Sequence, residues 1–190
     1  MSSGPSGEAD AWPWPAPEDD GAADHLKPGT PVPKLGLFCT AARFVNFTEM
    51  LRPAVVFVYP FMGGPARPNP QGWDDIPGAH GSTPQAVAYS RQIGRFSALG
   101  YDVHGISMQR FGDQLGSYRR LRLNFPLIHD PGDFSGALAL PSFEADGQRF
   151  LRRLTLIIGD GVIKRTLYPV HPPPRDAEQV LSILSQTTSE

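Results

Sequence analysis

One local pattern constrains the fold most: a buried strand, a long loop and a helix start in direct succession. Ala54–Tyr59 is a continuous run of β-branched and aromatic residues, which is typical of a strand covered on both faces. Residues 61–81 are too rich in glycine and proline for regular structure and are long enough for a functional loop. Ser82 and Thr83, followed by Pro84 in the first turn, predict a helix N-terminus.

The chain beyond this point alternates helix and strand patterns. A helical spacing from Gln85 to Leu99 ends at Gly100. The other predicted elements are strand 101–108, helix 112–123, strand 125–129, a hairpin of strands 154–158 and 162–168, and an amphipathic helix 175–184. This order predicts an α/β fold with buried parallel strands in a mixed sheet and with helices on both faces.

The composition predicts one domain preceded by a tail. A chain of 190 residues is long enough for a single core. Residues 1–33 hold seven prolines and six acidic residues, and we expect them to be disordered or loosely draped, with the domain spanning residues 34–190. Within the tail, Trp12–Pro15 is either a docking motif or part of a solvated tail whose aromatic rings stick nonspecifically or pack on their own domain.

Charge, hydropathy and cysteine content exclude several classes of protein. A net charge of −2 provides no basic field for nucleic acid, and no apolar run approaches the length of a membrane span. We therefore expect a soluble, cytoplasmic protein with neither nucleic acid nor membrane as a partner. The single cysteine, Cys39, excludes an internal disulfide and a thiol-only metal site. We expect no metal and no cofactor.

Two stretches carry a family resemblance. Gly72–Gln85 reads GWDDIPGAHGSTPQ, and Arg153–Ile158 reads RLTLII. Together with Tyr168–Val170, they resemble the bacterial branch of the peroxiredoxins whose active loop reads G-W-D-x-I-P-G-A-R-G-C-T-P-Q-S-C. The resemblance covers nearly all of residues 34–184. It implies a thioredoxin-like mixed sheet flanked by helices, an active-site arginine at Arg153, and a homodimer.

The chain departs from this family at the residues that perform its chemistry. On the loop motif, the peroxidatic cysteine falls on Ser82 and the resolving cysteine on Val87. A peroxidatic cysteine reacts as a thiolate and is oxidised to a sulfenic acid that can be reduced again. A serine hydroxyl keeps its proton and has no such cycle. We therefore expect no thiol peroxidase activity.

Three explanations for Ser82 stay open. Serine has replaced the cysteine of a one-cysteine peroxidase, or serine is native and the scaffold serves another purpose, or Cys39 has taken over the redox role. The third is the weakest, because Cys39 follows an early apolar run well before the loop, and a free cysteine is more often a small buried hydrophobe.

The candidate site residues follow from the resemblance and from side-chain chemistry. Their simpler roles are helix capping for the hydroxyls, a surface ion pair for the arginine and packing for the aromatics. The catalytic candidates are Ser82, Arg153 and His80, and the ligand-binding candidates are Thr83, Tyr59 and Trp73. His171 is a weaker candidate than His80, whereas His104 and His129 lie in strand patterns and are expected to be structural.

Three classes of function are therefore carried forward. The first is a repurposed scaffold that binds or transforms a small organic molecule by positioning and electrostatics. Arginines outnumber lysines 14 to 3, a composition expected of a GC-rich genome, where such a scaffold could serve specialised metabolism. The second is a thiol peroxidase and antioxidant protein in the form of a cysteine-to-serine variant. The third is a non-catalytic interaction protein.

Overall fold

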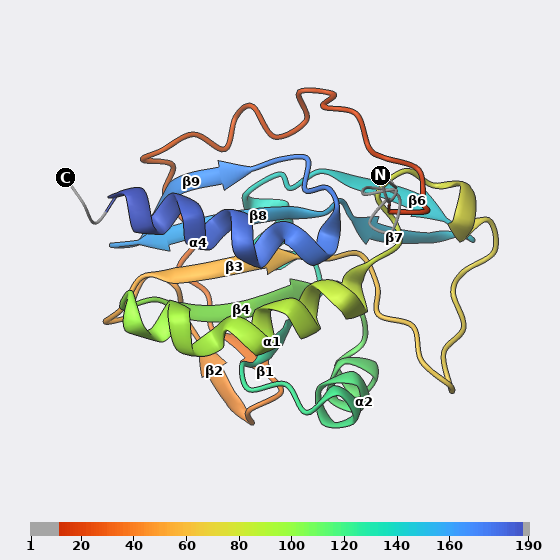
Figure 1. Cartoon of the computed structure of the whole chain (residues 1–190), viewed down its shortest axis with the longest axis horizontal. Coiled ribbons are helices and arrows are strands. Elements are labelled where there is room, and N and C mark those ends of the chain that lie inside the picture. Colours follow the sequence, from red (N-terminus) through yellow and green to blue (C-terminus); the bar gives the residue numbers. More distant parts are fainter. Residues whose placement is uncertain (1–11, 188–190) are drawn as a thin grey trace, which may run out of the picture.

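The computed structural model describes residues 12–187, and a mixed seven-stranded sheet forms the centre of that part of the chain (Figure 1). The strand order is β2-β1-β5-β4-β3-β8-β9. The bounds of these strands are β1 Leu37–Cys39, β2 Arg43–Val45, β3 Ala54–Val58, β4 Asp102–Ser107, β5 Leu127–His129, β8 Leu154–Gly159 and β9 Val162–Leu167. A separate hairpin joins β6 (Ser142–Ala145) to β7 (Gln148–Leu151).

The middle of the sheet confirms the predicted strand–helix–strand units. Strand β3 pairs in parallel with β4, β4 pairs in parallel with β5, and β3 pairs antiparallel with β8. All five residues of β3 are buried, as the unbroken apolar run indicated. The helices are α1 Ser82–Ala98, α2 Phe111–Leu121, α3 Asp133–Ala137 and α4 Asp176–Thr187, with 3-10 turns η1 Trp73–Asp75 and η2 Pro173–Arg175.

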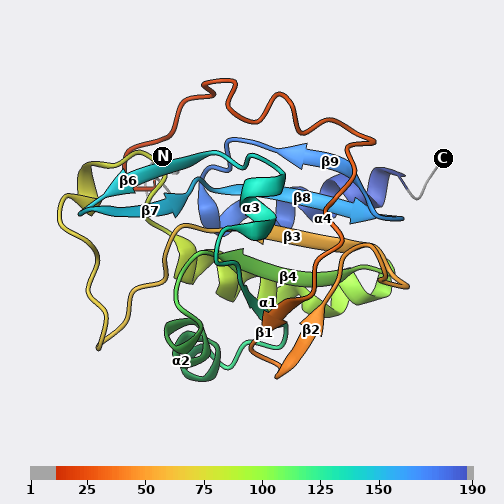
Figure 2. The same ribbon diagram turned by 180° about the vertical axis from the view of Figure 1, so that it is seen from behind.

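The two faces of the sheet have separate cores. Val55 and Phe57 of β3 pack with residues of α1 and α4 in one cluster, whereas Val56 and Val58 pack with Phe134 of α3 in the other. Figures 1 and 2 show α1 and α4 in front of the sheet in one view and α3 in front of it in the opposite view. The predicted mixed sheet with helices on both faces is therefore confirmed.

Over its described part, the tail lies against the domain, which agrees with the draped rather than the disordered form of the expectation. From residue 12 onward the chain runs along the β9 edge of the sheet (Figures 1 and 2). Ala23, Leu26 and Val32 are buried in the α3-side core, and the Gly29 amide donates to the Ile163 carbonyl at 2.7 Å. The proline-rich composition concealed this order, because the stabilising partners are the apolar face and the open backbone edge of β9. Residues 1–11 of the predicted tail lie outside the described residues.

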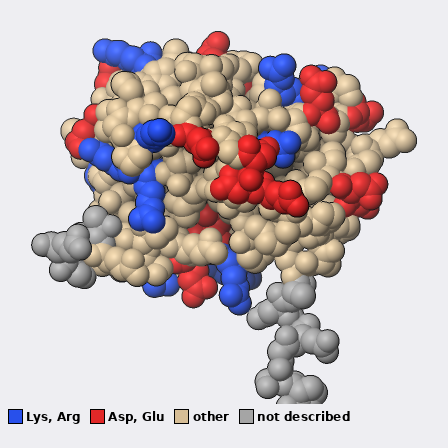
Figure 3. All heavy atoms as spheres, turned by 90° about the horizontal axis from the view of Figure 1, so that it is seen from above, with Lys and Arg blue, Asp and Glu red and all other residues tan. Residues whose placement is uncertain are grey.

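Several short elements were not predicted. Strand β2 has three residues, β6 and β7 have four each, and α3 has five, which is too short for a clear periodicity. Strand β5 begins two residues later than predicted, and α2 begins one residue earlier and ends two earlier. In the described part of the chain, no helix is long and apolar enough to cross a membrane. Figure 3 shows that basic and acidic side chains share the face seen there.

Candidate functional site

The site is built around the guanidinium of Arg153, in the short link between β7 and β8. Only 3% of this residue is exposed. Its Nη2 donates to the carbonyls of Ala79 and His80, at 3.2 and 3.1 Å, and to Ser82 Oγ at 3.2 Å. The end of the loop after β3 therefore wraps the guanidinium. The structure brings Ser82 and Arg153 together as predicted, while their catalytic roles stay predictions.

Ser82 does not act as the helix cap. Gly81 occupies the N-cap position of α1 with φ 110°, and no side chain caps this end. Ser82 is 2% exposed, and its hydroxyl accepts a hydrogen bond from Arg153 instead. Glycine is suited to this left-handed turn because it has no Cβ. Capping therefore does not account for the serine, and the free amides of the first turn add positive potential beside it.

A buried relay extends from Arg153 to the start of α4. Arg153 Nη1 donates to Gln85 Oε1, and Gln85 Nε2 donates to Asp176 Oδ2 at 2.8 Å. Tyr89 Oη and Thr155 Oγ1 donate to the same carboxylate oxygen, each at 2.7 Å. Sequence reasoning missed Gln85, Tyr89 and Asp176, because polar residues at helical spacing normally indicate a solvated face. Through the hydrogen bond from Arg153 to Gln85, this relay helps to fix the orientation of the guanidinium.

Burial governs the electrostatics of this relay. It lowers the pKa of Arg153 to about 9, and the negative charge of Asp176 opposes that shift. Burial also raises the pKa of Asp176, against the hydrogen bonds from Thr155, Tyr89 and Gln85. Within residues 12–187, Arg153 forms no ion pair and its Nε has no hydrogen-bond partner. A buried cation in contact only with neutral groups is an attractive site for an anion.

His80 has partners other than Ser82. Its Nε2 lies 2.7 Å from Asp74 Oδ1, and its ring stacks on that of Trp14 with centroids 3.6 Å apart. The hydrogen bonds of the described residues include none between this ring and Ser82. Only the backbone carbonyl of His80 enters the site, through Arg153. Among the described residues, the His80 ring and the Ser82 hydroxyl therefore do not form a dyad, and a catalytic role of His80 stays a prediction.

The three ligand-binding candidates lie in different surroundings. Thr83 is half-buried in the first turn of α1. Tyr59 is fully buried, which raises the pKa of its phenol, and its Oη has no hydrogen-bond partner among the described residues. Trp73 belongs to an aromatic cluster with Phe61, Phe143 and Phe150. The contacts of Trp73 are those of a packing residue, and the ligand-binding roles of all three stay predictions.

Cys39, His104 and His171 are buried or half-buried within the fold. Cys39 is fully buried in β1, which weighs against a redox role. His104 is also buried, and burial, reinforced by the charge of Arg43, lowers its pKa to about 4. A neutral imidazole inside the core agrees with the structural role predicted for it. His171 is half-buried in the segment after β9.

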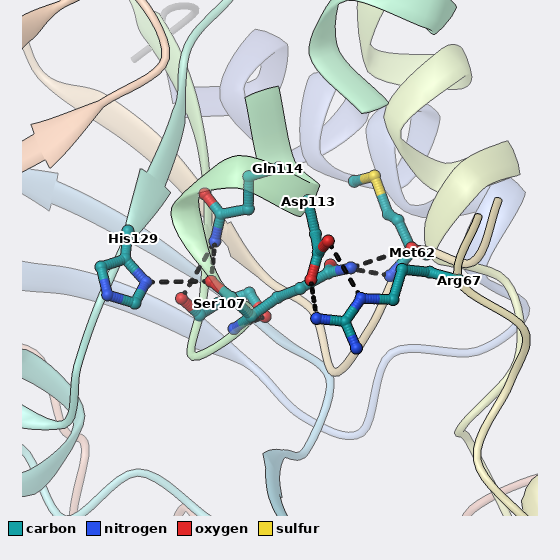
Figure 4. Close-up of polar contacts among 7 residues, drawn as sticks. Met62, Arg67, Ser107, Asp113, Gln114 and His129 are labelled. Carbon is teal, nitrogen blue, oxygen red and sulfur yellow. Dashed lines mark hydrogen bonds and ion pairs between the residues drawn. The ribbon is translucent and has the colours of Figure 1, made fainter. Parts of the chain in front are cut away.

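A second polar cluster ties the loop after β3 to the end of β4 (Figure 4). The Gln109 side chain accepts from the Met62 amide at 3.0 Å and donates to the Met62 carbonyl at 2.9 Å. His129 Nδ1 lies 2.9 Å from the Gln109 carbonyl, and Arg67 pairs with Asp113 at 3.0 Å. These contacts hold the start of the loop, as Arg153 holds its end. Sequence reasoning had assigned His129 a structural role and had overlooked Gln109.

The sheet order, the loop-to-helix turn and the buried arginine together define a thioredoxin-like fold of the peroxiredoxin type. Solved structures confirm this fold. Peroxidoxin BcpB from Mycobacterium tuberculosis superposes with a TM-score of 0.69 at 18% sequence identity, over 85% of this chain and 98% of that chain. A cysteine-to-serine mutant of PrxQ from Xylella fastidiosa gives 0.70 at 17% identity, over 86% and 98%.

The likeness extends to a second kind of peroxiredoxin. A cysteine-to-serine mutant of peroxiredoxin 6 from Arenicola marina gives a TM-score of 0.67 at 18% identity, over 87% of this chain and 76% of that chain. No protein-family model matches the chain. No curated protein matches it either. The resemblance noted in the sequence is therefore confirmed at the level of the fold, while the activity has to be argued from the site.

Proposed function

We propose that this chain is a peroxiredoxin-fold protein without thiol peroxidase chemistry, and that it binds a small organic anion at Ser82 and Arg153. The observation that carries the proposal is the state of the arginine. Its guanidinium is buried against Ser82 and three loop carbonyls, with no carboxylate paired to it in residues 12–187. A carboxylate or enolate oxygen would supply the charge that these neutral partners lack.

The chemistry available to the site supports binding and positioning. Arg153 Nη2 and the Ser82 hydroxyl can both donate to one ligand oxygen, and the start of α1 adds positive potential. Among the described residues, the Ser82 hydroxyl has one hydrogen bond, which it accepts from the Arg153 cation. It therefore has no base in contact with it. A transformation at this site would therefore proceed by orientation and electrostatic stabilisation rather than by a covalent serine intermediate.

A ligand titration followed by thermal unfolding tests the proposal. The probes are formate, acetate and benzoate, which share the carboxylate and differ in the organic group. A ligand that binds only the folded state stabilises it by about 2.7 kcal/mol at a concentration of 100 Kd. We expect at least one probe to raise the Tm in this way. Ser82→Ala should weaken that probe by roughly tenfold, the effect of one charge-assisted hydrogen bond.

Ser90→Ala is the matched control, because Ser90 also lies on α1 but its hydroxyl donates to Asn124 at an exposed position. This variant should bind the probe as the parent does. Equal weakening in both serine variants, or no Tm shift with any probe, would contradict the proposed site. A cytoplasmic location and a homodimer stay predictions, as does service in specialised metabolism. A non-catalytic interaction role becomes the preferred alternative if the titration fails.

A further inference from the structure

The start of the described chain lies on the loop that holds Arg153. Trp14 stacks on the His80 ring with an interplanar angle of 10°, and the Pro15 carbonyl accepts from the Gly78 amide at 3.1 Å. A Cβ on Gly78 would lie 3.2 Å from Pro17. The carbonyls of this same loop segment bind the guanidinium. The N-terminal segment and Arg153 therefore contact the same few residues.

The contact continues to the residue before Ser82. A Cβ on Gly81 would lie 2.8 Å from the Trp12 ring and 2.6 Å from Pro173. The backbone that leads into α1 thus runs between an aromatic ring of the N-terminal segment and a proline of η2. Ser82 itself is 2% exposed and Arg153 is 3% exposed. A ligand that enters from this side has to displace the ring.

Farther along, the segment is attached to the domain at several places. The Tyr168 hydroxyl donates to Asp20 Oδ1 at 2.8 Å. Residues 29–32 pair with β9 through backbone bonds, such as that from the Ile163 amide to the Thr30 carbonyl at 2.8 Å. Between these residues, Thr166 Oγ1 of β9 donates to the Leu26 carbonyl at 2.7 Å, and Ala23 and Leu26 are buried, while a pocket of about 300 Å³ lies beside them. Residues 23–32 are thus firmly attached to the domain, whereas residues 12–20 are held by fewer contacts.

We propose that residues 12–20 form a strap that closes the Ser82–Arg153 site and lifts from residues 78–81 to admit a ligand. The proposal rests on the proposed function only in that the closed site is taken to be a ligand site. Its first part has one ring stack, one backbone hydrogen bond and proline contacts, and its second part has the Asp20–Tyr168 bond. Segments held by so few contacts open locally while the core stays folded.

The strap is also suited to reclose. The backbone pairing of residues 29–32 with β9 keeps Trp12 and Trp14 near the loop after the strap opens. Reclosure is therefore an intramolecular event at high effective concentration. The two prolines between Trp12 and Pro17 stiffen the backbone and reduce the entropy lost on closing. Opening therefore breaks only the contacts of residues 12–20, and closing restores them, while residues 29–32 stay paired with β9.

A thiol placed under the strap reports its opening without any ligand. In the full-length chain, Ser82→Cys replaces one oxygen atom by sulfur. The parent, whose one cysteine is the buried Cys39, gives the labelling background. The rate of modification by an aromatic disulfide reagent is measured under native conditions. We expect Ser82→Cys to react slowly, and Ser82→Cys with Trp14→Ala to react about tenfold faster, because loss of one aromatic stack enlarges the open population.

Two further variants complete the test. Tyr168→Phe keeps the ring but removes the bond to Asp20, so it should also accelerate labelling of Ser82→Cys; it decides the test alone if Trp14→Ala does not fold. Phe44→Ala, at an exposed ring on the opposite edge strand β2, should leave the rate unchanged. A slow rate that neither strap variant raises, or an intact strap that leaves the thiol as reactive as an exposed one, would overturn the strap. Failure of the carboxylate titration alone would leave the strap standing.

Discussion

Ser82 and Arg153 form a contact that would suit a thiolate as well as it suits a neutral hydroxyl. The distance of 3.2 Å from Nη2 to Oγ is that of a hydrogen bond. The guanidinium also donates to Gln85, which in turn donates to Asp176. A charge fixed in this way, in a buried place, acts strongly on an atom beside it. The electrostatic field that would lower the pKa of a thiol is therefore present at the Ser82 oxygen.

The first prediction at this scale concerns Ser82→Cys. We expect the pKa of the new thiol to lie below the ordinary value of about 8.5, because the arginine and the start of α1 favour the anion. The thiolate ultraviolet absorbance, followed against pH, measures it. Hydrogen peroxide should convert this thiol to a sulfenic acid, detectable as a dimedone adduct by mass spectrometry.

Arg153→Lys in the Ser82→Cys background is the control for that prediction. Lysine keeps a positive charge but cannot hold the loop carbonyls and Gln85 together, so the thiol pKa should rise towards 8.5 and oxidation should slow. An ordinary pKa in Ser82→Cys, unchanged by Arg153→Lys, would show that the field has no effect on position 82. The thiol peroxidase alternative for the chain would then lose its support.

Single-residue reasoning from sequence reached part of this site. The loop motif identified Ser82, because glycine, proline and tryptophan at fixed spacing leave few other alignments, and the separate stretch Arg153–Ile158 identified Arg153. It could not identify Gln85 and Asp176, whose roles depend on α1 and α4 meeting over the sheet. It offered the His80 ring as a catalytic candidate, whereas the group that contacts Arg153 is the His80 carbonyl. Backbone groups carry no sequence signature, so this contact could not be predicted from residue types.

Among the elements, the turn into α1 is the most constrained. Gly81 has φ 110°, and a Cβ there would collide with Pro173 and Trp12. Gly81→Ala should therefore destabilise the protein by about 2–4 kcal/mol through backbone strain and overpacking. It should also loosen the strap. Denaturant unfolding measures the free energy of unfolding, and the labelling rate of Ser82→Cys measures the strap.

Gly94→Ala is the matched control within the same helix. Gly94 lies in the interior of α1 with open space around its Cα and no positive φ. Alanine there should stabilise the protein by about 0.5–1 kcal/mol, because it restricts the unfolded chain and favours helix. A similar loss of stability in both variants would mean that helix propensity, and not the turn at Gly81, determines the effect.

The long elements were predictable because each pattern repeats several times within them. Strands β3 and β8 are almost unbroken apolar runs, and α1 has apolar residues at helical spacing. The hairpin β6–β7 is short and turns through Asp146 and Gly147, both at positive φ. Its strands are recognisable only through the aromatic cluster that they form with Trp73. That cluster is a tertiary contact, which local patterns do not contain.

For the whole molecule, alkaline pH should report the attachment of the strap. Burial, and then the hydrogen bond to Asp20, raise the pKa of Tyr168 from 10.0 to about 12. A phenol with a raised folded pKa contributes stability that is complete below pH 10 and is lost as the pH rises through 12. The parent should be more stable than Tyr168→Phe at pH 8, and this difference should shrink between pH 10 and pH 12.

Thermal unfolding of both proteins across that range measures the difference. The buried tyrosines Tyr59 and Tyr89 also have raised pKa values, but both proteins contain them, so their contributions cancel in the comparison. A constant difference from pH 8 to pH 12 would show that the Tyr168 hydroxyl does not hold Asp20 in solution.

The pairing of the chain's first described segment with β9 has a consequence for biosynthesis. Asp20 and its partner Tyr168 are 148 residues apart in sequence. A ribosome that adds about 5–20 residues per second needs roughly 7–30 s between them. During that interval the nascent chain carries its tryptophans without the surface that receives them. A segment that is made before the domain is thus among the last to find its place, and the site is completed only when β9 and the residues after it have emerged.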